Sequence, residues 1–207
     1  MNFGRVLLLA VLCMATATAC DWWSGPKQVK SQATLKRAYW GLPQDGGADV
    51  TSLITCPNGY PCDTFANAAL FNDPQPDMNK RLTLIWTCEP QHLVLSEVVI
   101  ATLKVRIDCI AGPPIVPRTI AIVDASWGSG SSSATIDVTQ QVRDICGPNA
   151  VRCQVPAMAY IFGMPDKNPK MLRIRYTCNG QTTPGQQSLE NGVVDLRCER
   201  NADLGLQ

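Results

Sequence analysis

The chain has 207 residues, of which 45% are hydrophobic and 17% charged, and its formal net charge is +1. The charges nearly cancel and form no basic stripe, so the sequence gives nucleic acid binding no electrostatic support. Beyond the N-terminal segment, no apolar run approaches the ~18 residues that a membrane-spanning helix needs. We therefore expect neither a nucleic acid partner nor a spanning helix.

The first residues have the pattern of a secretory signal peptide. Arg5 precedes an apolar run, Val6 to Met14, and the small residues Ala15 to Ala19 follow. We predict a signal peptide over residues 1–19 and export to an oxidising compartment, where cysteines can pair. The protein would be periplasmic or membrane-anchored in a bacterium, and secreted otherwise.

Cys20 follows directly after this segment and has no counterpart among the other cysteines. Ala17-Thr18-Ala19-Cys20 resembles a bacterial lipobox, in which the cysteine is lipidated and becomes the first residue. The leucine usual three positions before the cysteine is Ala17 here, and ordinary cleavage after Ala19 fits the same residues. The sequence leaves both alternatives open: a lipoprotein anchored to the membrane through Cys20, or a simply secreted protein.

Eight of the ten cysteines form two sets of four at nearly the same spacing. Trp40-Gly41 and Trp127-Gly128 keep the same register, as do Asp49-Val50-Thr51 and Asp137-Val138-Thr139. This pattern indicates a duplicated module stapled by disulfides. The two sets are Cys56, Cys62, Cys88 and Cys109, and Cys146, Cys153, Cys178 and Cys198.

The repeat defines the domain organisation that we predict. An N-terminal leader covers residues 20–31, module one 32–111, a Pro-rich linker 112–117, module two 118–200 and a tail 201–207. Pro-rich linkers are extended and stiff. Modules of this size are small enough that disulfides contribute substantially to their stability.

Alternating apolar residues predict that most of each module is β-strand. Ile120-x-Ile122 alternates, as does Leu172-x-Ile174-x-Tyr176-x-Cys178, which places one row of side chains on a buried face. The exception is residues 137–146, where Val138, Val142 and Ile145 recur at helical spacing after Asp137, a helix-capping residue type. We expect a mainly β fold of two tandem, antiparallel β-sandwich-like modules, each with one short helix.

Four cysteines per module allow three disulfide connectivities in each. We favour Cys56–Cys62 and Cys146–Cys153, because each pair closes a short loop around a turn. The remaining pairs, Cys88–Cys109 and Cys178–Cys198, would then join the ends of neighbouring strands. Metal binding is disfavoured, because the cysteine spacings are not those of zinc knuckles and no histidine accompanies them. We expect no metal and no cofactor.

Several short motifs recur in the same order in both modules. Module two contains Ala125-x-Trp127-Gly128, Phe162-Gly163 and a strand that runs from Lys170 to Cys178, and module one has Phe71-Asn72-Asp73-Pro74 and Lys80-Arg81-Leu82. This frame resembles the sea-urchin-egg-lectin or rhamnose-binding-lectin domain, which also occurs in tandem. The resemblance implies a lectin-like fold and a non-enzymatic, carbohydrate-binding protein.

The chain departs from that family where the family holds its sugar. The family's Tyr-Gly-Arg is Trp40-Gly41-Leu42 in module one and Trp127-Gly128-Ser129 in module two. Met164 replaces the family's aspartate in module two, and the glutamate that opens the family's first strand aligns with Lys30 and Pro117. The resemblance therefore implies chiefly the fold.

Five residues are candidates for contact with a ligand. An aromatic face suits the apolar face of a sugar, while lysine and aspartate can hydrogen-bond its hydroxyls. The alternatives are that the tryptophans pack in the cores and that the lysines are charged edge-strand residues that discourage sheet pairing. The candidates are Trp40, Asp73, Lys80, Trp127 and Lys170.

The function that we expect is binding rather than catalysis, with a glycan as partner. The alternatives are a protein-binding or structural cell-envelope lipoprotein, or a secreted inhibitor, that keeps the scaffold without sugar binding. A Ser-His-Asp or Cys-His centre would have to use the single histidine, His92, which lies in the turn-like stretch Glu89-Pro90-Gln91-His92. This stretch lies outside the repeat frame, so we expect a solvated loop histidine.

Overall fold

The computed structural model describes residues 31–42, 46–73, 77, 79–109, 119–129, 135–163 and 168–198. The predicted signal peptide, Cys20, the leader up to residue 30, Met164, the linker at 112–117 and the tail at 201–207 lie outside the described residues. We call residues 31–109 the N-terminal half and residues 119–198 the C-terminal half. In the described part of the chain, no helix is long and apolar enough to cross a membrane.

The described part of the N-terminal half consists of strands and one short 3-10 helix. In chain order these elements are β1 (Gln32–Leu42), β2 (Gly46–Asp49), η2 (Thr51–Leu53), β3 (Cys62–Phe65), β4 (Arg81–Glu89), β5 (Leu93–Ile100) and β6 (Lys104–Ile107).

The described part of the C-terminal half has its main strands in the same order and also contains two α-helices. Its elements are β7 (Ile120–Gly128), β8 (Thr135–Asp137), α2 (Thr139–Cys146), β9 (Arg152–Pro156), α3 (Ala159–Phe162), β10 (Met171–Cys178), β11 (Gln181–Thr182), β12 (Gln186–Leu189) and β13 (Val193–Arg197). The protein is therefore mainly β, as predicted.

Equivalent strands pair in the same way in the two halves. β1 lies between β2 and β4, and β7 lies between β8 and β10, in each case antiparallel. Trp40 is opposite Leu82 across β1 and β4, just as Trp127 is opposite Leu172 across β7 and β10. β3 pairs with β6, and its counterpart β9 pairs with β13. The repeat that the cysteine spacing predicts is thus also present in the pairing register of the strands.

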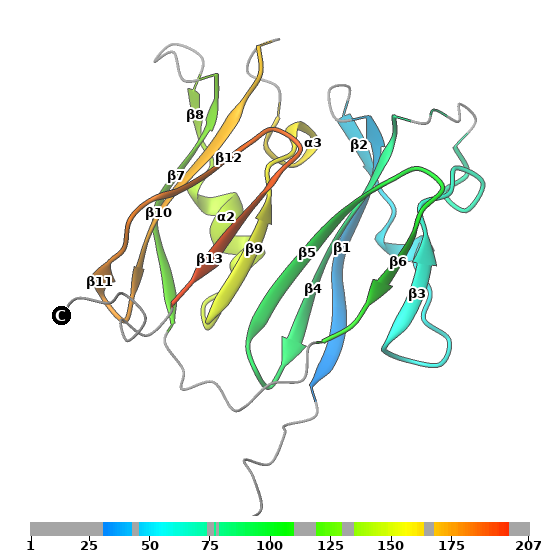
Figure 1. Ribbon diagram of the computed structural model, residues 1–207, viewed down its shortest axis with the longest axis horizontal. Coiled ribbons are helices and arrows are strands. Elements are labelled where there is room, and N and C mark those ends of the chain that lie inside the picture. The colour runs from blue at the N-terminus through cyan, green and yellow to red at the C-terminus, as the bar shows by residue number, and fades with distance from the viewer. Residues whose placement is uncertain are drawn as a thin grey trace, which may run out of the picture.

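One sheet crosses from one half to the other. Its six strands have the order β13-β9-β5-β4-β1-β2, because β5 and β9 pair in parallel through Leu93 with Arg152 and Val94 with Cys153. Figure 1 shows this sheet between the β7–β10 sheet on one side and the β3–β6 pair on the other. The two halves thus share a sheet, which the pattern of separate modules does not predict.

The cores also exchange residues across this boundary. Ile85 and Val94 of the N-terminal half pack in the core cluster of the C-terminal half, and Val151 packs in the other cluster. Leu82, Leu84 and other alternate residues of β4 pack in the N-terminal core, while Thr83 and Ile85 on the opposite face are also buried. β4 is therefore covered on both faces.

The expectation of one short helix in each half is wrong. In the C-terminal half α2 forms with Val138 and Val142 fully buried, as their spacing predicted, and α3 is a second helix. In the described N-terminal half the equivalent segment is only the 3-10 turn η2. The interval from Thr51 to Cys56 is shorter than that from Thr139 to Cys146, and Pro57 disfavours helical conformation in the residue before it.

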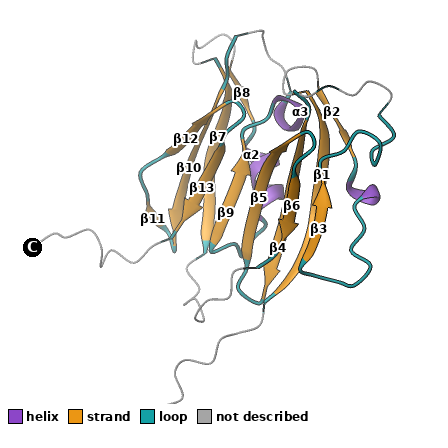
Figure 2. Ribbon diagram, turned by 45° about the vertical axis from the view of Figure 1, so that its right-hand side comes forward, coloured by secondary structure: helices purple, strands orange, loops and turns teal. Residues whose placement is uncertain are grey.

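The four disulfides have the pairing that the sequence analysis favoured. Cys56–Cys62 and Cys146–Cys153 close short loops, and Cys88–Cys109 and Cys178–Cys198 join strand ends. Figure 2 shows that the strands of both halves run along the same general direction, with the helices between or beside the sheets.

Candidate functional site

The two tryptophans predicted to face a ligand lie in the interior. Trp40 is 4% exposed and Trp127 is fully buried. Each packs at a tilt against the phenylalanine of its own half, Phe71 at 5.1 Å and Phe162 at 5.7 Å between ring centroids. Both tryptophans therefore pack in the cores, which was the alternative to ligand contact. Neither indole offers a face to a sugar.

Asp73 and Lys80 do come together with Trp40, but as partners of one another. The Trp40 indole Nε1 donates to Asp73 Oδ2 at 2.7 Å, and the Lys80 ammonium donates to the same oxygen at 2.5 Å. The Lys80 and Asp73 side chains are 15% and 10% exposed. The carboxylate is thus engaged by donors of the protein, which leaves little of it for a ligand.

Lys170 is nearly enclosed in the C-terminal half. It is 3% exposed, its ammonium donates to the Asn168 carbonyl at 3.2 Å, and Glu190 lies 3.8 Å away. Lys80 and Lys170 precede β4 and β10, which are paired on both sides. The alternative of an edge-strand lysine is therefore also wrong, because both ammonium groups are tied down inside the fold.

The repeated Asp-Val-Thr motifs fasten the first strand of each half to the segment that follows. The Thr51 hydroxyl accepts the Ala38 N–H at 2.8 Å, and the Thr139 hydroxyl accepts the Ala125 N–H at 2.9 Å. Hydrogen bonds from the Thr51 hydroxyl and amide lower the pKa of Asp49 below its usual value, and Thr139 does the same to the pKa of Asp137. These motifs are structural, but the expected helix cap at Asp137 is wrong: the N-cap of α2 is Val138, which makes no side-chain cap hydrogen bond, and Asp137 lies one residue before it.

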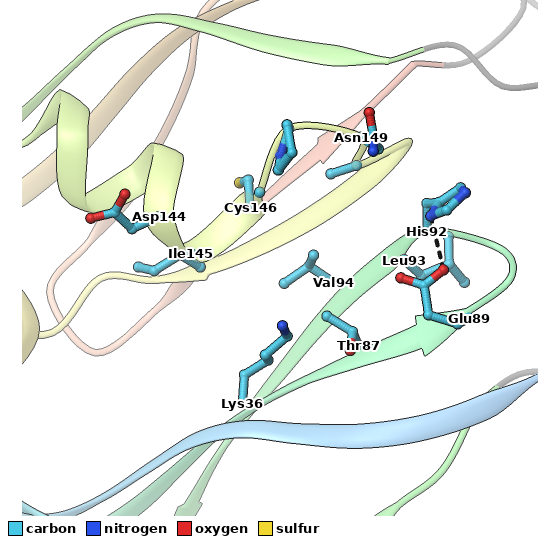
Figure 3. Close-up of a pocket in the computed structure, with 13 residues that line it drawn as sticks. Lys36, Thr87, Glu89, His92, Leu93, Val94, Asp144, Ile145, Cys146 and Asn149 are labelled. Carbon is cyan, nitrogen blue, oxygen red and sulfur yellow. Dashed lines mark ion pairs between the residues drawn. The ribbon is translucent and has the colours of Figure 1, made fainter.

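An open pocket lies where the two halves meet. It has a volume of about 260 Å³ and is bounded by the β4–β5 turn, by β1 and by the segment that joins α2 to β9. Figure 3 shows Lys36 rising from β1, Thr87 and Glu89 on β4, and Asp144 on α2 around it. The lining residues are Lys36, Thr87, Glu89, His92, Leu93, Val94, Asp144, Ile145, Cys146, Gly147, Pro148, Asn149 and Ala150.

Lys36 reaches the pocket because of a β-bulge. The register of β1 against β4 shifts between Leu35 and Arg37, which leaves Lys36 as the extra residue. Such a bulge turns a side chain out of the regular alternation. β7 has the same bulge at Val123, so only the N-terminal half carries a cation at this position. Within the described residues, no acidic group forms an ion pair with Lys36.

Glu89 and His92 form the wall of the pocket at the β4–β5 turn. His92 Nδ1 lies 2.8 Å from Glu89 Oε2, and both side chains are about half exposed, as expected for a loop histidine. The His92 carbonyl accepts the Val151 N–H at 3.1 Å, which joins the turn to the C-terminal half. The sequence predicts a loop at His92 but carries no signal that this loop contacts the C-terminal half.

Asp144 faces the N-terminal half from α2. Its Oδ1 accepts a hydrogen bond from Gln140 Nε2 at 2.8 Å. In the N-terminal half, the pKa of Arg37 is raised by the Tyr39 hydroxyl, by the charge of Asp49 and, across the gap, by the charge of Asp144. Asp144, Gly147 and Pro148 also line a neighbouring hollow of about 360 Å³, where the Arg143 guanidinium donates to the Ile122 carbonyl at 2.9 Å.

The pocket therefore combines donors, acceptors and apolar surface in one small space. Lys36 and the Asn149 amide can donate, Glu89 and Asp144 can accept, and Leu93, Val94 and Ile145 supply apolar walls. In the described part of the chain no cluster of histidine, cysteine or acidic residues is arranged to hold a metal ion. The arrangement suits a small polar ligand that carries several hydroxyl groups.

No family model matches the chain, and neither a curated protein nor a solved structure matches it significantly.

Proposed function

We propose that this chain is an exported tandem-domain binding protein that takes a carbohydrate in the pocket between its two halves. The observation that carries the proposal is the composition of this pocket, where Lys36, Asn149, Glu89 and Asp144 surround apolar walls. A pyranose has hydroxyl groups that need hydrogen bonds and C–H faces that need apolar contact. A pocket with both polar groups and apolar walls suits a ligand of this kind.

The size of the pocket points to a short ligand. At about 260 Å³ it lies just below the ~300–1,000 Å³ usual for pockets that enclose drug-sized molecules. A monosaccharide or the end of a glycan chain fits this range. The pocket is open to solvent at the side of Lys36 and Glu89, whose exposed side chains can adjust to the ligand.

The repeated geometry supports a lectin-like scaffold. The Trp-Phe pairs, the Asp-Thr hydrogen bonds and the disulfides recur in both halves, which is the frame on which the family resemblance rests. We propose that each half is a β-sandwich-like module of this type. The sugar then binds between modules rather than beside Trp40 or Trp127, because those rings are buried.

Export is part of the same proposal. Four disulfides are compatible with an oxidising compartment, since a reducing cytosol would keep the thiols apart. Mass spectrometry of the native N-terminus tests the proposed lipid anchor. Acyl mass on Cys20 is the expected result in a bacterial host, and an unmodified Cys20 would contradict the anchor but not the export.

A glycan array followed by titration tests carbohydrate binding. For a glycan that binds, Lys36→Ala or Asn149→Ala should weaken the affinity about tenfold, or ~1.4 kcal/mol, through the loss of one hydrogen bond. Val123→Ala, at the matched bulge of the C-terminal half, is the control and should leave the affinity unchanged. The absence of any bound glycan, or equal affinity in all four proteins, would contradict the proposal.

A further inference from the structure

The pocket between the halves is joined to a second hollow beside α2. Asp144, Gly147 and Pro148 line both the pocket and the neighbouring hollow of about 360 Å³, and Figure 3 shows Asp144 on α2 at the edge of the pocket. Asp144 and Pro148 are exposed, and a Cβ atom added at Gly147 would meet only open space. These residues therefore form a shallow rim between the two spaces, which together we call the groove.

The second hollow lies between one face of α2 and the first residues of β7. Gln140, Arg143, Asp144 and Gly147 line it, and their spacing of three, four and seven residues places them on the same side of the helix. Residues 120–122 of β7 form the opposite wall. Seven residues of α-helix rise about 10 Å, so the groove extends beyond the space that a single sugar ring fills.

Arg143 is held in place in this hollow by the main chain of β7. Its Nη2 donates to the Ile122 carbonyl at 2.9 Å and to the Val123 carbonyl at 3.3 Å, and its Nε donates to the Ile122 carbonyl at 3.3 Å. Among the described residues, its Nη1 and the Gln140 Oε1 form no hydrogen bond. A fixed guanidinium with unused donors, beside an unused amide acceptor, suits the hydroxyl groups of a sugar.

The N-terminal half has no equivalent hollow. Its counterpart of α2 is the short 3-10 turn η2. Leu35, which corresponds to Ile122 beside the matched bulge, donates its N–H to the Tyr60 hydroxyl at 3.1 Å, and Tyr60 packs against the N-terminal core. The groove therefore has a direction, from Lys36 in the pocket to β7 of the C-terminal half.

We propose that the groove binds a chain of at least two sugar residues, with the terminal sugar in the pocket and the next sugar in the hollow beside α2. This inference rests on the proposed carbohydrate function and specifies the ligand as an oligosaccharide. The pocket alone, at about 260 Å³, is smaller than the ~300–1,000 Å³ usual for ligand pockets, whereas the hollow lies within that range. Exposed Ala121 and Pro148 supply apolar contact for the second ring.

Titration with a series of chain lengths tests the second subsite. The probes are the methyl glycoside of the terminal sugar of an array hit and the corresponding disaccharide and trisaccharide. The parent should bind the disaccharide about tenfold more tightly than the methyl glycoside, because the linked second sugar adds contacts without a second loss of translational freedom.

Ala121→Phe should remove this gain by filling the hollow, and should leave the affinity for the methyl glycoside unchanged. Ala121 is exposed and lines the hollow but not the pocket. Val123→Phe is the matched control, since Val123 is exposed on the same strand and lines neither space. It should keep the gain, and near-ultraviolet circular dichroism checks that both variants are folded.

Equal affinity of the parent for the methyl glycoside and the disaccharide would overturn the second subsite and leave the pocket as a sugar site. A gain that persists in Ala121→Phe, or that Val123→Phe also abolishes, would overturn it as well. The absence of any bound glycan would instead refute the proposed function.

Hydrogen exchange gives a readout that does not depend on a variant. The trisaccharide should protect the amides of residues 120–122 and 140–143 more than the methyl glycoside does, while both probes should protect residues 87–94. Equal protection of residues 120–122 and 140–143 by the two probes would contradict the second subsite.

Discussion

At the scale of single residues, one carboxylate connects several parts of the N-terminal half. Asp73 accepts hydrogen bonds from the Trp40 indole, which is in the core, and from Lys80, which leads into β4. In the C-terminal half the Trp127 indole donates instead to the Gly163 carbonyl at 2.9 Å. The same tryptophan is thus held by a charged group in one half and by the backbone in the other.

Asp73→Asn should therefore destabilise the fold. The expected cost is ~1.5–3 kcal/mol, since hydrogen bonds to charged groups contribute about this much and the largely buried Lys80 would no longer face the Asp73 charge. Chemical denaturation measures it. Asp63→Asn is the control, because Asp63 pairs with Lys104 at the exposed surface and its loss should not change stability measurably. An Asp73→Asn variant as stable as the parent would show that this carboxylate is free for another role.

Asp195 predicts a dependence of stability on pH. Burial acts to raise its pKa, but hydrogen bonds from Arg152 and Arg197 outweigh burial and lower the pKa from 3.8 to about 2. The unfolded chain therefore takes up this proton near pH 4 and the folded chain only near pH 2. The stabilisation is complete above about pH 4 and is lost as the pH falls from about 4 to about 2.

Asp195→Asn should reveal this contribution by comparison with the parent. At pH 7 the variant should be less stable by about 1 kcal/mol, a value reduced for solvent screening because the side chain is 26% exposed. The difference should shrink between pH 4 and pH 2. Asp108→Asn, which removes an exposed pair with Arg106, should show no such change. A difference that stays constant down to pH 2 would mean that Asp195 does not act through its charge.

Sequence patterns grouped residues that do lie together in the fold, but did not show their surroundings. Trp40, Asp73 and Lys80 do lie together, because motifs that recur in a repeat tend to occupy equivalent places. A pattern of residue types does not show whether a polar group faces solvent or a partner inside the fold. Lys36 carried no signal at all, because its place in the pocket results from a one-residue bulge that the sequence does not mark.

At the scale of elements, the disulfides hold strand ends that hydrogen bonds alone leave weakly fixed. Cys88 ends the buried row on β4, and Cys109 follows β6, so their bridge ties the six-stranded sheet to the β3–β6 pair. Cys178 and Cys198 do the same for β10 and β13. The cysteine spacing and the alternation of apolar residues were sufficient to predict these elements, because both are local in sequence.

Replacing Cys88 and Cys109 with alanine should lower stability by ~2–4 kcal/mol, because the bridge restricts the unfolded chain. Thermal denaturation of the double variant against the parent measures this. The Cys178–Cys198 bridge closes a loop of nearly the same length. Replacing these two cysteines with alanine should therefore cost a similar amount. A Cys88/Cys109 variant that melts like the parent would contradict a stabilising role for this bridge.

At the scale of the whole molecule, the shared sheet makes the two halves one structural unit. β5 pairs with β9, the cores exchange Ile85, Val94 and Val151, and the Tyr160 ring lies 5.7 Å from that of Tyr39. Burial raises the pKa of Tyr160 to about 12, although the hydroxyl of Thr83 lowers it in part. This contact could not be predicted from the sequence, because pairing between modules leaves no periodic signal within either one.

The two halves should therefore unfold together. Tyr160→Ala should lower the midpoint of a single thermal transition, with a cost of ~2–4 kcal/mol for the loss of a largely buried aromatic side chain. Phe65→Ala, which truncates an exposed aromatic residue, should change stability by less than ~0.5 kcal/mol. Calorimetry distinguishes the outcomes, and two separate transitions in the parent would contradict a single cooperative unit.

The central claim is that the ligand site lies between the two halves, and mapping a bound glycan by hydrogen exchange tests it most directly. With a glycan that binds on an array, protection should increase over residues 87–94 and 144–150, on opposite walls of the pocket. Residues 71–73 and 80–82, around Trp40 and Asp73, should not change. Protection at those residues instead, with none at the pocket, would contradict the account and place the sugar where the resemblance to the lectin domain alone predicts it.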